Sequence, residues 1–183
     1  MQQRLFLGFA PTTTQKARLS DLQQQLLCHL NPEAKALSIN NMHLTLCFLG
    51  QVDDDQRISL LDALDRLAKP RFSVRLNQFD LWPNAQVCCL KADEVEPPLT
   101  QLAKQTQAIA GRLQLHSSEH HFCPHISLFR KAKQWTRDEP ALLQLKEMNT
   151  LTLTLTPEHL HLYHSKSTST GVEYHILDSW TLG

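Results

Sequence analysis

The sequence predicts an α+β fold of two similar lobes, in which two antiparallel sheets face a central cleft and helices pack outside. Segments in which polar and apolar residues alternate, as they do in strands, are interspersed along the chain with three helical patterns. A short His-apolar-hydroxyl-apolar motif stands at His43 and returns 82 positions later at His125. No glycine-rich phosphate loop follows the first strand, which disfavours a doubly wound parallel sheet. Because no long linker interrupts the chain, residues 1–183 are expected to form one bilobal domain.

The first part of the chain predicts strands on either side of a helix. Residues 4–10 indicate a strand, and the hydroxyl residues 12–14 offer N-caps for a helix that ends at Pro32. A short strand near 37–39 leads into the first motif strand, 43–49. The apolar stripe of the helix is expected to consist of Leu19, Leu22, Leu26, Leu27 and Leu30.

The middle of the chain predicts a helix, a hairpin and another helix. Asp53 can cap a helix that ends before Pro70. An alternating strand, 71–79, and a compact apolar strand, 86–92, pair across a Trp-Pro-Asn turn. Pro97 opens the next helix, because proline suits the first helical turn. The expected apolar sides are Ile58, Leu61, Leu64 and Leu67 in the first helix and Leu99, Leu102, Ile109 and Leu113 in the second.

The last third begins with the second motif strand and ends in a series of strands. Residues 131–148 form the least regular stretch, for which we expect a loop with a short helix. Alternation then predicts three strands, over 151–156, 159–165 and 173–182.

The balance of charge restricts the nucleic-acid contacts that this chain can make. It has 18 basic and 18 acidic residues, whereas proteins that follow long duplexes carry a basic surplus. We therefore expect a protein that binds the end of a nucleic acid or a short ligand. A local basic group follows the second motif, and both RNA contact and a solvated loop stay open for it (Arg130, Lys131, Lys133 and Arg137).

Cysteine usage and the N-terminus favour a cytoplasmic protein. The five cysteines are odd in number, contain no C-x-x-C pair and lie mostly among apolar residues, so reduced structural thiols are predicted. The N-terminus lacks a signal pattern, and no apolar run approaches the length of a membrane span. We expect a monomer that does not contact a membrane.

The two motifs predict a phosphate site. Side chains alternate along a strand, so His43 and Thr45 share one face, as do His125 and Ser127. A single histidine of this kind is usually an ordinary polar residue, but two copies indicate a shared cleft. There the imidazoles would supply one acid and one base, and the hydroxyls would donate to phosphate oxygens. The opposite face of the first motif strand is expected to be apolar (Met42, Leu44, Leu46 and Phe48).

With these motifs and their flanks, the chain resembles the two-histidine (2H) phosphoesterase superfamily. Within it, the chain is most similar to the bacterial and archaeal RNA 2′,3′-cyclic phosphodiesterases, also called 2′-5′ RNA ligases. Ser127 replaces the commoner threonine and keeps the hydroxyl. Cys47 stands where many relatives carry a basic residue, so the strength with which this chain binds an RNA backbone near the first motif stays open. The likeness spans nearly the whole chain, with RLFLGF at 4–9, HLTLCFLG at 43–50, PHISLFR at 124–130 and HLYHS at 161–165.

The resemblance implies the same bilobal fold and specific roles, without a metal or a cofactor. It makes His43 the proton donor to the 3′ oxygen and His125 the proton acceptor from water, so that a 2′-phosphate remains; from the residues alone the two are interchangeable. Thr45, Ser127 and Arg130 would hold the phosphate oxygens. The expected partners are RNA ends that bear a 2′,3′-cyclic phosphate, such as tRNA halves, and the reverse reaction would make a 2′-5′ linkage.

Two predictions depend on details of the motif strands. Strict alternation places Arg130 opposite the motif histidine, so its side chain reaches the cleft only if the strand ends, twists or bulges after Leu128. Phe48 lies on the apolar face and is expected in the core. Phe9 and Phe129 are candidates for stacking a terminal base, although core packing is favoured for both.

Other functions stay open. The substrate could be a small cyclic nucleotide or a 2′-5′ oligonucleotide, or the chain could be a non-catalytic module that binds RNA ends. A metal-dependent hydrolase is a third class, since four histidines crowd before and within the second motif. No H-E-x-x-H pattern or Cys/His spacing supports it. These histidines are His116, His120, His121 and His125.

Overall fold

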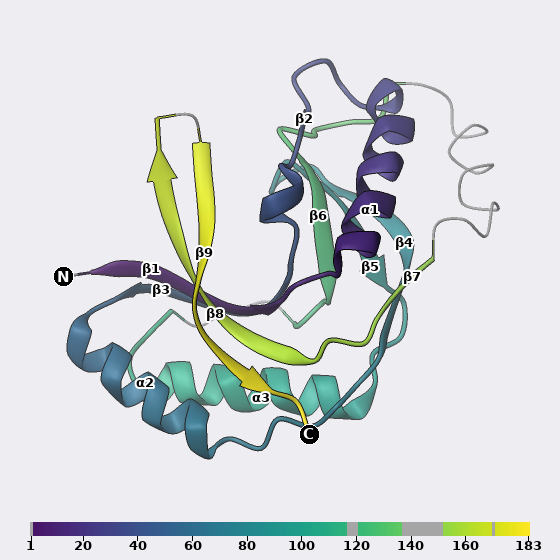
Figure 1. The fold of residues 1–183 in the computed structure, drawn as a ribbon. Helices are drawn as coiled ribbons and strands as arrows, with labels where there is room; N and C mark the ends of the chain where they lie inside the picture. Colours follow the sequence, from purple (N-terminus) through teal and green to yellow (C-terminus); the bar gives the residue numbers. More distant parts are fainter. Residues whose placement is uncertain (1, 117–120, 137–151, 170) are drawn as a thin grey trace.

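The computed structural model describes residues 2–116, 121–136, 152–169 and 171–183 (Figure 1). Its strands join in the order β7-β4-β5-β6-β3-β1-β8-β9, with β2 beside β6, and the pairings between them are antiparallel. The prediction of an α+β fold is confirmed, but the strands form one continuous antiparallel sheet and not two separate ones, because β3 pairs with β6. The two halves of this sheet meet where β3 and β6 pair through Leu44 and Ile126.

One half of the sheet, here called the β3 lobe, combines the N-terminal strand with both C-terminal strands. Helices α2 (Asp54–Arg66) and α3 (Pro97–Arg112) lie beneath it, and α3 packs on β3 (Figure 1). The β8–β9 hairpin extends past the other strands and projects from the lobe (Figure 1). The strands are β1 (Gln3–Phe9), β3 (Leu44–Val52), β8 (His159–Thr168) and β9 (Gly171–Thr181).

The other half, the β6 lobe, is built around the second motif strand. Helix α1 (Thr13–Leu26) packs against it. The β4–β5 hairpin turns through residues 83–86, close to the predicted Trp-Pro-Asn turn. The strands are β2 (Lys35–Ala36), β4 (Val74–Trp82), β5 (Val87–Ala92), β6 (His125–Arg130) and β7 (Leu153–Leu155). One continuous cluster of buried apolar residues runs through both lobes.

The helices begin at the capping residues and the proline that the sequence predicted. The Thr12 hydroxyl accepts the Gln15 backbone N–H, while the Gln15 side chain accepts the Thr12 N–H. Asp53 and Gln56 form the same reciprocal capping box before α2. Pro97 occupies the first turn of α3. These side chains satisfy N–H groups that a helix start otherwise leaves unpaired.

Some predicted details are wrong. Ile58 is 67% exposed, because α2 turns Leu60 and Leu64 toward the core instead. Leu27 is also exposed, since α1 ends at Leu26 and a 3₁₀ turn (Leu27–His29) follows. The short strand before the first motif lies at 35–36, and a 3₁₀ turn occupies Ile39–Asn41. Most of the irregular stretch predicted over 131–148 lies outside the described residues.

Candidate active site

The pairing of β3 with β6 brings the two motifs together. Leu44 lies opposite Ile126, and the strands run antiparallel. Continued by one residue in each direction, this antiparallel register places His43 opposite Ser127 and Thr45 opposite His125, and such cross-strand neighbours on one face typically lie about 5 Å apart at Cβ. Leu44 and Ile126 are fully buried, so the motif histidines and hydroxyls turn to the opposite face.

Both imidazoles are oriented in the same way. The Nδ1 of His43 lies 2.7 Å from the Asn41 carbonyl oxygen, and the Nδ1 of His125 lies 2.8 Å from the Cys123 carbonyl oxygen. A carbonyl only accepts, so Nδ1 carries the proton in each ring. In the neutral rings Nε2 is therefore free to accept a proton. The twofold likeness seen in the sequence thus extends to the carbonyl two residues before each histidine.

His43 is surrounded by aromatic rings. Its ring centroid lies 4.7 Å from that of Phe6, 4.9 Å from that of Tyr174 and 5.8 Å from that of Tyr163, and Tyr163 also stacks on Phe6. Burial lowers the pKa of His43 from 6.5 to about 4, and the positive charges of His125 and Arg130 add to this. When neutral, the Nε2 of His43 accepts the Thr45 hydroxyl at 2.9 Å.

His125 has one aromatic neighbour of a different kind. The Trp82 ring meets the imidazole edge to face, with centroids 4.6 Å apart and an interplanar angle of 73°. Burial lowers the pKa of His125, and the charge of Arg130 lowers it further. Both histidines are therefore mainly neutral near pH 7 before any anion binds.

Matching bulges in the two motif strands decide which side chains beyond the motif histidines and hydroxyls face the same side of the sheet. The pairing of β3 with β1 passes from Thr45 to Cys47 and skips Leu46. The pairing of β6 with β5 passes from Ser127 to Phe129 and skips Leu128. A bulge of this kind reverses the alternation of faces beyond it.

These bulges bring Arg130 and Phe48 to the cleft. Arg130 lines the cavity beside the motifs, and its phosphate role stays a prediction. Phe48, its counterpart 82 positions earlier, is 47% exposed and lines the same cavity, so the prediction that it belongs to the core is wrong. The bulge at Leu128 is tied to α1, because Gln23 donates its side-chain N–H to the Leu128 carbonyl at 2.7 Å.

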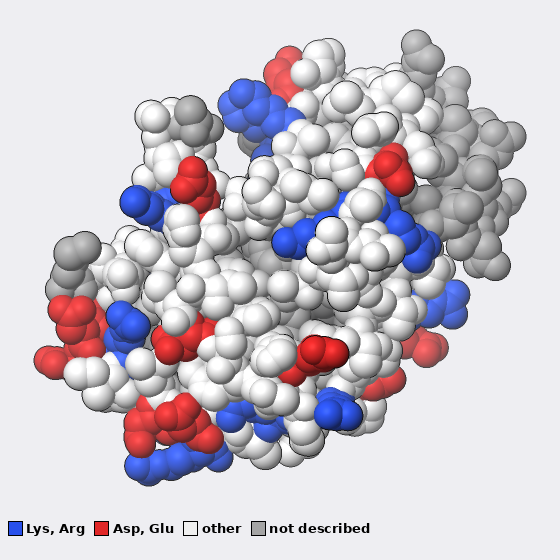
Figure 2. Space-filling model, viewed as in Figure 1, with Lys and Arg blue, Asp and Glu red and all other residues white. Residues whose placement is uncertain are grey.

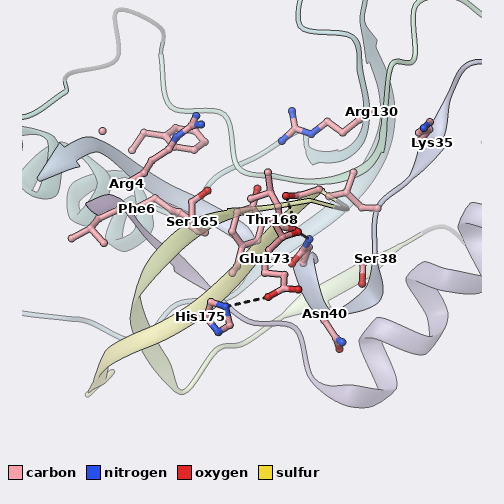
Figure 3. Close-up of a pocket in the computed structure, with 18 of the residues that line it drawn as sticks. Arg4, Phe6, Lys35, Ser38, Asn40, Arg130, Ser165, Thr168, Glu173 and His175 are labelled. Carbon is pink, nitrogen blue, oxygen red and sulfur yellow. Dashed lines mark hydrogen bonds and ion pairs between the residues drawn. The ribbon is translucent and has the colours of Figure 1, made fainter. Parts of the chain in front are cut away.

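The larger cavity, here called the Arg130 groove, holds about 1230 Å³ and runs between the β8–β9 hairpin and the segment of β2. Arg4 and Arg130 approach it from opposite sides, with Lys35 beyond Arg130 (Figure 3). Figure 2 shows a notch between this hairpin and the β6 lobe, with basic side chains on the rim of the β6 lobe and both signs of charge on the hairpin. Such a groove is better suited to short-range contacts with a phosphate chain than to the binding of a long duplex.

A second cavity, here called the Trp82 pocket, holds about 560 Å³ and opens beside His125. Its walls are mostly apolar, and Phe48 lies between it and the Arg130 groove. The residues that line the pocket are Thr45, Leu46, Cys47, Phe48, Trp82, Pro83, Asn84, Ala85, Gln107, His121, Phe122, Cys123 and His125.

Sequence reasoning missed the aromatic residues that touch the histidines. Phe6, Tyr163 and Tyr174 come from β1, β8 and β9, and Trp82 ends β4. Phe6 and Tyr163 lie in segments that carried the family resemblance, and no other signal in the sequence marked them. Phe9 and Phe129 are fully buried, so the preference for core packing over base stacking is confirmed for both.

Other predicted features can be located as well. All five cysteines are described and none forms a disulfide; Cys47, Cys88 and Cys89 are buried. Within the described residues, no cluster of three or more His, Cys, Asp or Glu is arranged to hold a metal ion. His120 lies outside those residues. None of the described helices has both the length and the apolar character needed to cross a membrane.

Comparisons with known proteins agree with this geometry. Residues 10–88 match the family described as LigT like Phosphoesterase. The RNA 2′,3′-cyclic phosphodiesterase of Escherichia coli (strain K12) is 30% identical over 120 residues, which are 63% of this chain and 68% of that protein.

Solved structures are similar over the full length. A crystal structure of a phosphoesterase has a TM-score of 0.86 at 26% identity, and covers 100% of this chain and 99% of its own. The crystal structure of E. coli LigT complexed with 3′-AMP has a TM-score of 0.85 at 26% identity, with the same coverage. The chain therefore belongs to the LigT-like phosphoesterases of the 2H family, as its two motifs predict.

Proposed function

We propose that this phosphoesterase is an RNA 2′,3′-cyclic phosphodiesterase that opens the terminal ring to a 2′-phosphate. The observation that carries the proposal is the twofold site itself. His43, just before β3, and His125, at the start of the paired strand β6, each donate the Nδ1–H to the backbone carbonyl two residues earlier, and Thr45, Ser127 and Arg130 accompany them. Two proton carriers with hydroxyl and guanidinium donors between them suit a displacement at phosphorus.

The proposed reaction uses one neutral and one protonated imidazole. Water attacks phosphorus as the neutral Nε2 of His125 takes its proton, and the phosphorus bond to the 3′ oxygen breaks as His43 protonates that oxygen. The lowered pKa of His125 keeps it neutral and ready to act as a base near pH 7. His43 needs a proton that burial disfavours, so the negative charge of the bound phosphate must raise its pKa.

The phosphate oxygens would be held by three groups. The Thr45 hydroxyl donates to the Nε2 of neutral His43; once that nitrogen is protonated, the hydroxyl proton is released for a phosphate oxygen. Ser127 lies across the strands from His43. Arg130 supplies a positive charge that lowers the pKa of both imidazoles. These donors perform the charge stabilisation for which other phosphoesterases use a metal, so the proposed activity is independent of divalent ions.

The choice of substrate rests on the relatives and on the groove. The E. coli relative is named for RNA 2′,3′-cyclic phosphodiesterase activity, and a similar structure holds 3′-AMP. The Arg130 groove offers space beyond one nucleotide and basic side chains along it, which favours an RNA end over a small cyclic nucleotide. With the 5′-hydroxyl of another RNA in place of water, the reverse reaction would form a 2′-5′ linkage.

The test is incubation with an oligoribonucleotide that ends in a 2′,3′-cyclic phosphate, followed by mapping of the product phosphate. We expect a 2′-phosphate end, formed equally well in excess chelator. Adenosine 2′,3′-cyclic phosphate serves as the small-nucleotide comparison. A 3′-phosphate product would reverse the oxygen assigned to His43, and inactivation by chelator with recovery in a divalent ion would contradict the metal-free reaction.

A further inference from the structure

The two cavities border different members of the catalytic pair. The Arg130 groove is lined by Phe6 and Asn41, which contact His43 through its ring and its Nδ1. The Trp82 pocket is lined by His125 itself and by Trp82, which packs on that imidazole. A phosphorus atom between the two histidines would therefore have a different cavity on each side.

The Trp82 pocket is far larger than the proposed hydrolysis needs. A water molecule occupies about 30 Å³ of the liquid, whereas the pocket holds about 560 Å³. Aromatic rings of Phe48, Trp82 and Phe122 line it, together with the side-chain amides of Asn84 and Gln107. Rings that offer stacking faces, with a few amides that pair with polar edges, are the chemistry that recognises an unpaired nucleobase.

Trp82 is held in place before any ligand arrives. Its Nε1–H donates to the Asp80 carboxylate at 2.9 Å, and the Lys91 ammonium donates to the same carboxylate oxygen at 2.6 Å. Asp80 and Lys91 stand on the paired strands β4 and β5, which fixes the carboxylate. An aromatic ring that is already ordered loses little freedom when a base stacks on it.

The direction of the reaction decides what this pocket receives. In-line displacement puts the entering and leaving oxygens on opposite sides of phosphorus. If His43 serves the ribose 3′ oxygen, the oxygen at His125 points toward the Trp82 pocket. When that oxygen belongs to water, no further group extends into the pocket. When it is the 5′ oxygen of a nucleoside, the attached ribose and base extend into the pocket.

We propose that the Trp82 pocket binds the nucleoside that carries the 5′ oxygen of a 2′-5′ phosphodiester, an assignment that rests on the function proposed above. In cleavage, the 3′-hydroxyl of the preceding ribose gives its proton to neutral His43, and its oxygen bonds to phosphorus. The phosphorus bond to the 5′ oxygen breaks, and protonated His125 donates a proton to that oxygen. The products are a 2′,3′-cyclic phosphate end and a 5′-hydroxyl nucleoside, and ligation is the reverse.

Two substrates with the same RNA body test the pocket. One is a tetraribonucleotide that ends in a 2′,3′-cyclic phosphate, and the other carries an adenosine joined to the same end through a 2′-5′ linkage. Single-turnover rates of ring opening and of adenosine release are compared for the wild type, Trp82→Ala and Trp82→Phe. Lys35→Ala, in the Arg130 groove, is the matched control because both substrates place RNA there.

Trp82→Ala should lower the ratio of adenosine release to ring opening about tenfold or more, since a stacked base is lost. Trp82→Phe should restore most of that ratio, and Lys35→Ala should lower both rates and keep the ratio. A wild type that opens the ring but never releases adenosine would refute the pocket assignment alone. An equal loss of both rates in Trp82→Ala would also refute it, because Trp82 would then act only through His125. If neither substrate reacts, the proposed function itself fails, and this inference fails with it.

Discussion

Acidification should destabilise this protein through His43 in particular. Burial lowers the pKa of its imidazole from 6.5 to about 4, so the unfolded chain takes up a proton at this residue before the folded protein does. Neutral His43 therefore contributes stability that is complete above pH 6.5 and is lost as the pH falls through 4. The two pKa values give a loss of about 2 kcal/mol in the free energy of unfolding between pH 7 and pH 5.

Urea unfolding of the wild type and of His43→Gln, at pH 7 and at pH 5, isolates this contribution. Glutamine keeps a polar side chain but does not titrate, so the wild type should lose about 2 kcal/mol more than the variant. His175→Gln, which removes an exposed histidine, provides the correction for histidine loss in general. An NMR titration of the His43 ring gives the same pKa directly.

Two outcomes would refute this reasoning. Equal losses of stability in the wild type and in His43→Gln would mean that the residue does not couple folding to protons. A ring of His43 that titrates near 6.5 in the folded protein would mean that Phe6, Tyr163 and Tyr174 do not shield it from water.

Three further predictions concern activity and stability. His43→Ala and His125→Ala should each remain folded by circular dichroism and lower the ring-opening rate on the order of 10²–10⁴-fold. Turnover near that of the wild type in either variant would contradict the mechanism. Thr45→Val and Ser127→Ala should each cost roughly 1–3 kcal/mol of transition-state stabilisation, whereas Thr45→Ser and Ser127→Thr keep the hydroxyl and should lower the ring-opening rate only slightly. A phosphorylated Thr45 or Ser127 in mass spectra would show that the residue acts as a nucleophile and not as a hydrogen-bond donor. Gly8→Ala should lower the free energy of unfolding by about 1–3 kcal/mol in urea, because its Cβ would lie 2.6 Å from a backbone carbonyl oxygen of β3; unchanged stability would show that the strands can separate there.

Much of the fold follows from local patterns in the sequence. Thr12 and Asp53 cap their helices because their side chains reach N–H groups only three residues ahead. The faces of His43 and Thr45 follow from the two-residue repeat of a strand, which needs no knowledge of the partner strand. The recurrence of that pattern at His125 then indicates the twofold arrangement.

The sequence alone did not place Arg130 and Phe48. Alternation put both on the face opposite their motif histidines, and bulges at Leu46 and Leu128 bring them to the cleft. A bulge arises from the register between two strands, so it depends on the residues of β1 and β5 as well. The hydrogen bond from Gln23 to the bulged Leu128 carbonyl spans 105 positions, which no local pattern encodes.

The sequence determined which residues are candidates for the reacting groups, and the tertiary structure decided their surroundings. Two histidines and two hydroxyls can be identified from their spacing, because each motif is contained within one strand. The shift in the pKa of His43 depends on Phe6, Tyr163 and Tyr174, and the aromatic pocket at His125 depends on Trp82. These rings come from separate strands, and desolvation and stacking depend on distance in space and not on distance along the chain.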